Sequence, residues 1–249
     1  MGFGFLSNHI SLHIYGKHTV DAFIKQKSSG YKVEKVWLDE RKYNDKNLDF
    51  LRKSLGKSTP IAKMTLELKQ SVAGDSQAQG WVAKVLMPTF SSSDLPHLLP
   101  GSTQCLLLDH LQDPHNVGAC IRSACAFGVK VIVMPKFSAC PINSTVAKVA
   151  AGALAHVKIV MANINQAVQV VQKEGFWVVA SSEHASMELS SQQVPTPVAW
   201  VVGNEHKGIS ASVLKRSDLQ IRLPTEPDFP SLNVSVATGI LLAYGRQKA

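Results

Sequence analysis

The polar segment from Asp113 to Ser123 contains the side chains that are best suited to catalysis or ligand binding. Asn116 offers an amide that both donates and accepts hydrogen bonds, and Arg122 offers a guanidinium that keeps its positive charge. The segment follows an apolar run, Cys105 to Leu108, which we expect to be a buried strand, and Asn116 is a good N-cap for the helix that follows. Because helix starts at the carboxyl ends of strands attract anions, Asn116 and Arg122 could bind a phosphate. A capped helix with a surface arginine is the alternative.

Two later segments repeat this pattern of an apolar strand that ends in a polar loop. Ala199 to Val202 leads into the loop from Gly203 to Gly208, and Leu219 to Pro224 precedes the segment from Ser231 to Asn233. Ligands of open α/β sheets bind at the carboxyl ends of the strands. The three loops together therefore favour a ligand site over helix capping alone.

Taken in order, these three segments resemble the motifs of the SpoU-type methyltransferases of the SPOUT superfamily. They are Asp113-Pro114-His115-Asn116-Val117-Gly118-Ala119 with Arg122-Ser123-Ala124, Gly203-Asn204-Glu205 with Lys207-Gly208, and Leu223-Pro224 with Ser231-Leu232-Asn233-Val234-Ser235. The resemblance implies an enzyme that transfers a methyl group from S-adenosylmethionine to a ribose 2′-hydroxyl of RNA. The bacterial large-subunit (23S) ribosomal RNA guanosine 2′-O-methyltransferases are the most similar subgroup, and transfer RNA is the alternative substrate because the motifs serve chemistry that both subgroups share.

The resemblance also implies roles for single residues. Gly203, Leu223 and Leu232 would line the S-adenosylmethionine pocket, and Arg122, Asn116, Glu205, Ser231 and Asn233 would form the catalytic site. Asn116 would orient Arg122 or the ribose, Glu205 would pair with Arg122 or a basic neighbour, and a glycine at 203 would let the ligand approach the backbone. Each residue has a structural alternative: Asn116 and Ser231 as helix caps, Asn233 as a first-turn polar residue, Glu205 as a solvated acid, and Gly203 as the end of a strand.

The family assigns the activation of the ribose hydroxyl to the residue that matches Arg122. A guanidinium has a pKa above ~12 and does not accept a proton at neutral pH. We therefore expect Arg122 to act electrostatically: its charge lowers the pKa of the hydroxyl and binds the neighbouring phosphate, which can itself relay the proton.

The chain divides into three parts by composition. Residues 1–88 are expected to form a small α/β domain, residues 89–103 are polar and rich in proline like a linker, and residues 104–249 alternate strands with helices. The resemblance implies that residues 1–88 are the RNA-binding domain of the family. This alternation predicts a mostly parallel α/β sheet. The resemblance adds a trefoil knot in residues 104–249 and a homodimer formed through that domain.

Charge favours an anionic partner without proving one. The net charge is +8, and residues 1–88 carry +6 of it, from 14 Lys and Arg less 8 Asp and Glu. Such an excess suits binding to a phosphate backbone, although scattered lysines are also common in proteins that bind no nucleic acid. A non-catalytic RNA-binding protein and a structural or small-molecule-binding α/β protein are the alternatives from other functional classes.

Several other functions lack support in the sequence. The four cysteines, at spacings of 15, 5 and 15, match neither a zinc site nor a disulfide framework, and we expect packed thiols and no metal. The glycine-rich fingerprints for ATP or NAD are missing. No apolar run approaches the ~20 residues that span a bilayer, and residues 1–5 lack the cationic start of a signal peptide, so we expect no membrane partner and a cytoplasmic location. One departure from the family is the segment Thr225-Glu226-Pro227-Asp228-Phe229-Pro230, which has two acids and two prolines where the family has a small-residue loop.

Overall fold

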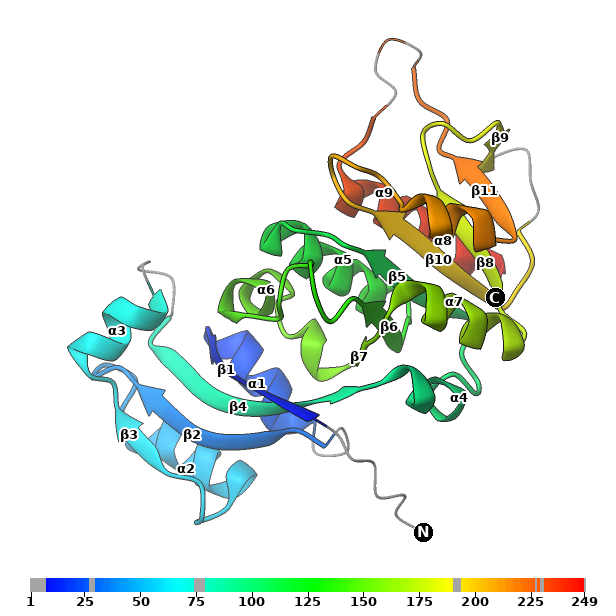
Figure 1. Cartoon of the computed structure of the whole chain (residues 1–249). Coiled ribbons are helices and arrows are strands. Elements are labelled where there is room, and N and C mark those ends of the chain that lie inside the picture. Colours follow the sequence, from blue (N-terminus) through cyan, green and yellow to red (C-terminus); the bar gives the residue numbers. More distant parts are fainter. Residues whose placement is uncertain are drawn as a thin grey trace. The chain divides into compact units, whose positions relative to one another are not determined.

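The computed structural model describes residues 8–26, 30–73, 79–189, 194–226, 228 and 231–248. The chain forms two compact units (Figure 1). Unit 1 contains Thr89–Pro141 and Val157–Ala249, and unit 2 contains Ser7–Pro88 and Ile142–His156. Among the residues described, none of the helices is long and apolar enough to cross a membrane.

Unit 1 is built on a parallel sheet with the strand order β4-β7-β6-β5-β10-β8-β11-β9. The strands are β4 (Trp81–Phe90), which pairs with β7 through Thr89 and Phe90, β5 (Gln104–Asp109), β6 (Val131–Met134), β7 (Lys158–Met161), β8 (Trp177–Ser181), β9 (Met187–Glu188), β10 (Val198–Gly203) and β11 (Leu219–Arg222). The predicted α/β fold with a mostly parallel sheet is confirmed. The trefoil knot stays a prediction.

Helices cover both faces of the central strands, which is why β5 and β6 are buried along their whole length and their middle residues are apolar. Cys105 and Leu107 of β5 pack into a core with α4 (Leu95–Leu98), α7 (Ile164–Lys173) and α8 (Ala211–Arg216). On the other face, α5 (Pro114–Ala126) and α9 (Val234–Lys248) pack against each other, and α9 also contacts β5 and β10. The remaining short elements are η2 (Ser92–Asp94) in unit 1 and η3 (Ala153–Ala155) in unit 2.

Unit 2 is a smaller α/β arrangement. Strand β2 (Lys32–Leu38) pairs antiparallel with β4 and parallel with β3 (Ile61–Lys63), while β1 (Asn8–Tyr15) pairs with β4. Its helices are α1 (Lys17–Lys25), α2 (Asp45–Leu55), α3 (Leu66–Ala73) and α6 (Ser144–Val149). The α/β character expected for this part of the chain is therefore observed.

The predicted linker, residues 89–103, differs from the structure. It contains the end of β4, η2 and α4, and all of it belongs to unit 1. Leu95 and Leu99 are buried in the core beside β5, and this burial of apolar side chains holds the segment in place. The linker prediction relied on Pro96 and the serines of this segment and overlooked its buried leucines.

A second difference concerns residues 142–156, which the sequence assigned to the C-terminal domain. In the structure they pack in unit 2. The Tyr31 hydroxyl donates a 2.5 Å hydrogen bond to the carbonyl of Leu154, and Gly152, at φ 89°, approaches Ala22 so closely that a Cβ would lie 2.9 Å from its methyl carbon. These contacts join segments more than 100 residues apart, which no local pattern reveals.

A buried polar pair fixes α9 on the sheet. The indole Nε1 of Trp200 in β10 donates a 2.9 Å hydrogen bond to Oε1 of Gln104 in β5, and both side chains are buried. Helix α9 lies against this pair at Gly245, where a Cβ would come within 2.2 Å of Gln104 Oε1 and 3.1 Å of Trp200 Nε1. Only glycine lets the helix approach without displacing the hydrogen bond.

We expect Gly245→Ala to lower the free energy of unfolding by about 1–3 kcal/mol, because the new methyl group must break the Gln104–Trp200 hydrogen bond or move α9. Gly239→Ala is the matched control in the same helix, since the nearest atom to its new Cβ is Ser123 Oγ at 3.9 Å. Alanine favours helix by up to about 1 kcal/mol, so this control should be neutral or stabilising. Urea unfolding measures both variants, and equal stabilities would contradict the close-packing argument.

Candidate active site

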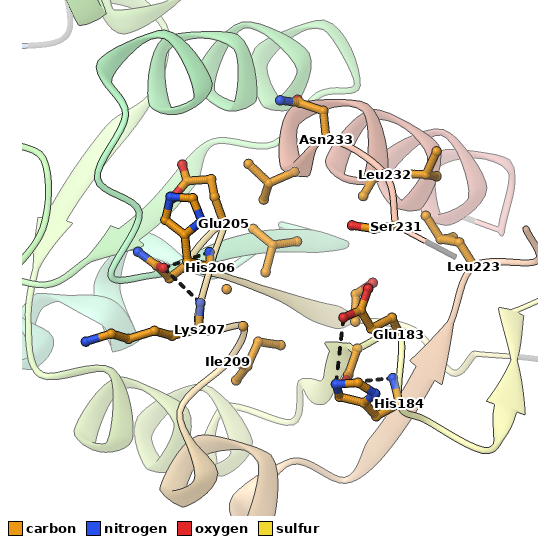
Figure 2. Close-up of a pocket in the computed structure, with 18 of the residues that line it drawn as sticks. Glu183, His184, Glu205, His206, Lys207, Ile209, Leu223, Ser231, Leu232 and Asn233 are labelled. Atoms are coloured by element: carbon orange, nitrogen blue, oxygen red, sulfur yellow. Dashed lines mark hydrogen bonds and ion pairs between the residues drawn. The ribbon is translucent and has the colours of Figure 1, made fainter. Parts of the chain in front are cut away.

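A cavity of about 680 Å³ lies in unit 1, where the loops that follow β8, β10 and β11 meet the start of α9 (Figure 2). It is lined by Ser181–His184, Val202–Ile209, Leu214, Leu223, Thr225, Ser231–Val234 and Ala237. In a parallel sheet the carboxyl ends of the strands share one edge, so the predicted loops after β10 and β11 meet at the cavity, whereas the predicted loop after β5 does not line it. The lining combines apolar side chains such as Val202, Ile209 and Leu223 with polar and charged ones, which suits a small organic ligand that carries polar groups.

Gly203, Leu223 and Leu232, which the resemblance assigns to the cofactor pocket, line this cavity, and so do three residues that it assigns to the catalytic site, Ser231, Asn233 and Glu205. Their functional roles stay predictions. The sequence did not single out Ser181–His184 or Ile209. Ser181 and Ser182 come directly after β8, so the rule of polar residues at strand ends could have found them. Of the atypical 225–230 segment, residues 227, 229 and 230 lie outside the described residues.

Gly203 is needed for the conformation of its own loop, in addition to the predicted close approach of a ligand. A Cβ at this position would lie 2.3 Å from the backbone of Gly208 and of Ile209. The loop turns back on itself, because Asn204 and Gly208 exchange two backbone hydrogen bonds of 3.0 and 2.9 Å. Asn204 Oδ1 also accepts hydrogen bonds from the backbone N–H groups of His206 and Lys207, both at 3.0 Å. Gly203 therefore permits the turn that forms one wall of the cavity.

A chain of hydrogen bonds joins the three sequence motifs at the cavity. The Asn116 amide Nδ2 donates to Glu205 Oε1 at 3.1 Å, and its Oδ1 accepts from Asn233 Nδ2 at 3.0 Å. Asn233 Oδ1 in turn accepts from the backbone N–H and the hydroxyl of Ser235, at 2.9 and 2.6 Å. An asparagine suits the middle position, because one amide supplies both a donor and an acceptor.

The helix caps in the structure differ from those expected from sequence. Asp113, not Asn116, is the N-cap of α5, and its side chain accepts a hydrogen bond from the backbone N–H of His115 at 2.9 Å. Asn116 lies inside the first turn, which leaves its side chain free for Glu205. Asn233 immediately precedes α9 and caps it through Ser235, while Ser231 is exposed and lies ahead of the helix.

Arg122 is not among the residues that line the cavity. It is exposed on α5, six residues after Asn116, which places it about 9 Å further along the helix and about 120° around it. The expected pairing of Glu205 with Arg122 is not observed, because Glu205 takes its hydrogen bond from Asn116. Within the described residues, the Arg122 side chain has no hydrogen bond or ion pair.

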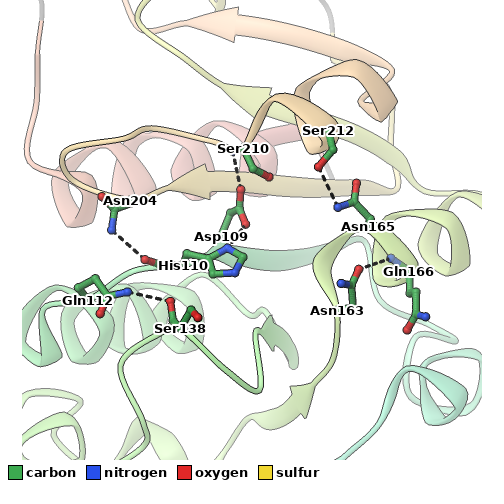
Figure 3. A network of polar contacts seen from close by, with 10 residues as sticks. All are labelled: Asp109, His110, Gln112, Ser138, Asn163, Asn165, Gln166, Asn204, Ser210 and Ser212. Atoms are coloured by element: carbon green, nitrogen blue, oxygen red, sulfur yellow. Dashed lines mark hydrogen bonds and ion pairs between the residues drawn. The ribbon is translucent and has the colours of Figure 1, made fainter.

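Asp109, which the sequence analysis did not name as a site residue, holds together the loops after β5 and β10 (Figure 3). Its carboxylate is 1% exposed, accepts a 2.7 Å hydrogen bond from the backbone N–H of Ser210, and lies 2.7 Å from His110 Nδ1. The carbonyl of His110 accepts a 2.9 Å hydrogen bond from Asn204 Nδ2. A buried carboxylate requires such partners, so Asp109 ties the loop after β5 to the loop after β10.

The thiols and metal ligands give no further site among the described residues. Cys105, Cys120 and Cys140 are buried, Cys125 is partly buried, and all four are free, as the packed-thiol prediction expected. Burial raises the pKa of Cys120 to about 12, so this thiol stays protonated. Across the described ranges, no group of three or more His, Cys, Asp and Glu side chains could hold a metal ion.

We expect Asp109→Ala to lower the free energy of unfolding by about 1–3 kcal/mol more than Asp218→Ala does. Both carboxylates accept a 2.7 Å hydrogen bond from a backbone N–H, Asp109 from Ser210 and Asp218 from Val178, but Asp218 is exposed and water can replace it. Denaturant titration compares the two variants. Equal losses of unfolding free energy would show that the burial of Asp109 does not increase its contribution to stability.

Comparison with known proteins relates this chain to one protein family. Residues 103–243 match the family described as the SpoU rRNA methylase family. The 23S rRNA (guanosine-2′-O-)-methyltransferase RlmB of Pseudomonas aeruginosa is 33% identical over 235 residues, covering 92% of this chain and 93% of that protein. The protein of the same name from Nitrosomonas europaea is 32% identical over 236 residues, covering 93% and 90%.

Solved structures agree on the fold. The SpoU methyltransferase AviRb of Streptomyces viridochromogenes has a TM-score of 0.80 at 20% identity, covering 96% of this chain and 89% of that one. An rRNA methyltransferase of Sinorhizobium meliloti with bound AdoMet has a TM-score of 0.81 at 21% identity, covering 96% and 87%. The family match over more than half of the chain and the full-length relatives together show that this protein belongs to the SpoU rRNA methylase family.

Proposed function

We propose that this protein transfers a methyl group from S-adenosylmethionine to the ribose 2′-hydroxyl of a guanosine in large-subunit ribosomal RNA. The observation that carries the proposal is the cavity lined by Glu205 and Asn233, whose side chains are joined by hydrogen bonds through Asn116, so that each of the three motifs contributes one residue. Relatives over 30% identical along the full chain carry that activity in their names.

The cavity fits S-adenosylmethionine by size and by chemistry. Val202 and Ile209 are buried and, with Leu223 and Leu232, offer apolar surfaces to a flat adenine ring. Its volume of about 680 Å³ lies within the 300–1,000 Å³ range of small-molecule pockets. The turn permitted by Gly203 brings backbone N–H and carbonyl groups to the same wall. When bound, the cofactor supplies an electrophilic methyl group on a positively charged sulfur.

The residues at the rim would align the ribose and stabilise charge. Asn116 is held by hydrogen bonds on both sides, so its orientation is fixed before substrate arrives. The hydroxyl must lose its proton as the new carbon–oxygen bond forms. We assign to Arg122 the electrostatic part of this step: its charge favours the alkoxide and binds the adjacent phosphate, to which the proton can pass.

Unit 2 supplies a surface suited to the RNA backbone. Three cations, Lys17, Arg41 and Lys42, and one acid, Asp39, line a second cavity of about 530 Å³, so positive charge is in excess there. Cations at such a position neutralise phosphates and release counterions, which makes binding depend on salt. The assignment of RNA binding to this unit follows from the charge of residues 1–88 and remains part of the proposal.

We further propose a homodimer formed through α5 and α9. Val236 and Ile240 of α9 are 51% and 42% exposed, and α9 packs on α5 beside them. Ser123 faces Gly239 across this contact, so its neighbour Arg122 lies at the edge of the same face. A second copy on this face would cover the two apolar side chains and enclose Arg122.

The first experiment incubates the protein with total bacterial RNA and methyl-labelled S-adenosylmethionine, followed by digestion to locate 2′-O-methyl nucleosides. We expect label in large-subunit ribosomal RNA, and a loss of at least about 100-fold with Arg122→Ala, because a charge that stabilises the transition state is removed. S-adenosylmethionine binding, measured by calorimetry, should persist in this variant, since Arg122 does not line the cavity.

Arg216→Ala, at another exposed arginine of unit 1, is the control and should keep its activity. Label confined to transfer RNA would replace the proposed substrate. The absence of label in every RNA would contradict the proposed function.

The dimer is tested by Ile240→Glu, which places a charge in the proposed apolar contact. We expect wild-type protein to have twice the 27.0 kDa chain mass in light scattering and the variant to have the single mass, with methyl transfer reduced in parallel. Leu66→Glu alters an exposed leucine of unit 2 and should leave the mass unchanged. A wild-type monomer at working concentration would overturn this proposal.

A further inference from the structure

The loop after β6 presents an aromatic side chain to solvent close to the polar chain of the active site. Phe137 is 75% exposed, although burial of a phenylalanine ordinarily stabilises a fold. Lys136 precedes it and places its Nζ 5.7 Å from the centre of the ring. Since β6 is parallel to β5, this loop leaves the sheet at the same edge as the first sequence motif.

The loop is held firmly in spite of this exposure. Ser138 has a φ of 56°, a left-handed conformation that non-glycine residues rarely adopt. Gln112 Nε2 donates a 2.7 Å hydrogen bond to the carbonyl of Ser138 (Figure 3), and the backbone N–H of Cys140 donates a 2.8 Å hydrogen bond to the carbonyl of Leu111. Strained backbone persists only where its surroundings fix it, and such positions cluster at functional sites.

The same residue connects the loop to the active site. Gln112 directs its side chain to Ser138, and its backbone N–H lies 3.5 Å from Glu205 Oε2, to which it donates. Glu205 is the carboxylate that holds Asn116. Phe137 therefore directly precedes Ser138, whose carbonyl is linked through Gln112 to Glu205.

An exposed, pre-positioned aromatic ring beside a cation has a specific affinity for unpaired nucleobases. Every base has a π-face that stacks on an aromatic side chain, and proteins that bind single-stranded RNA use such rings together with Lys or Arg on the phosphates. A ribose inside a paired helix is hard to align with a cofactor in a pocket, so the substrate must present its target nucleotide unpaired.

We propose that Phe137 stacks on an unpaired nucleobase of the RNA substrate next to the methylated nucleotide, while Lys136 binds an adjacent phosphate. This inference rests on the proposed function, because it assigns a substrate contact for that reaction. Phe137 acts in binding and positioning the RNA and takes no part in methyl transfer itself.

The test measures kcat and KM for RNA in wild-type protein and in Phe137→Ala, Phe137→Leu and Phe137→Trp, together with the Kd for a short fluorescein-labelled single-stranded RNA of mixed sequence. Loss of one stacked base should raise KM and Kd by about 5- to 100-fold in Phe137→Ala, with kcat at saturating RNA and the affinity for S-adenosylmethionine unchanged. Phe137→Leu should resemble the alanine variant, because leucine is apolar but has no π-face. Phe137→Trp should keep wild-type values or improve on them.

Trp177→Ala is the matched control. Trp177 is also an exposed aromatic residue of unit 1, at 44%, but it begins β8 and therefore lies at the opposite edge of the sheet. Its loss should leave KM for RNA unchanged.

Three results would overturn the inference: wild-type KM and Kd in Phe137→Ala, full rescue by Phe137→Leu, or a change of oligomeric mass in Phe137→Ala, which would assign the ring to a protein interface. If wild-type protein methylates no RNA, the proposed function fails, and the Kd series still decides whether Phe137 binds a base.

Discussion

The parallel pairing of β5 with β10, closed at its carboxyl end by Asp109, is the constraint on which the site depends. Gly203 lies beside Asp109 in the register of these two strands. The buried carboxylate binds the backbone N–H of Ser210, and Asn204 binds the carbonyl of His110. Loops separated by nearly 100 residues are thereby fixed to each other, and the loop after β10 forms one wall of the cavity, which the loops after β8 and β11 and the start of α9 complete.

The polar chain at the rim follows from this constraint. Once the loop after β10 turns back at Gly208, Glu205 faces the first turn of α5, where Asn116 meets it. The packing of α9 on α5 then brings Asn233 to the other side of the same amide. Each side chain is satisfied by its neighbours, so the site is organised before any ligand binds, which lowers the entropy lost on binding.

The proposed function gives the two units different roles, and these roles agree with the distribution of charge. Unit 1 holds the candidate cofactor cavity with its hydrogen-bonded polar residues, whereas the cavity of unit 2 is lined by three cations and one acid. Phe137 and Lys136 add an aromatic and a cationic contact within unit 1, beside the rim. In the proposed function, affinity for the RNA backbone and selection of an unpaired nucleotide therefore come from different surfaces.

The sequence by itself determined the parallel α/β fold, the three loops and six of the residues that line the cavity, because strand periodicity and the motifs are local in the chain. Only the tertiary structure decided that Glu205 binds Asn116 and not Arg122, that Gly203 serves its own loop, that Asp109 anchors the site, and that residues 142–156 pack in unit 2. The physical reason is the same in each case. These contacts join residues far apart in sequence, and their partners are set by strand order and helix packing, which no local pattern encodes.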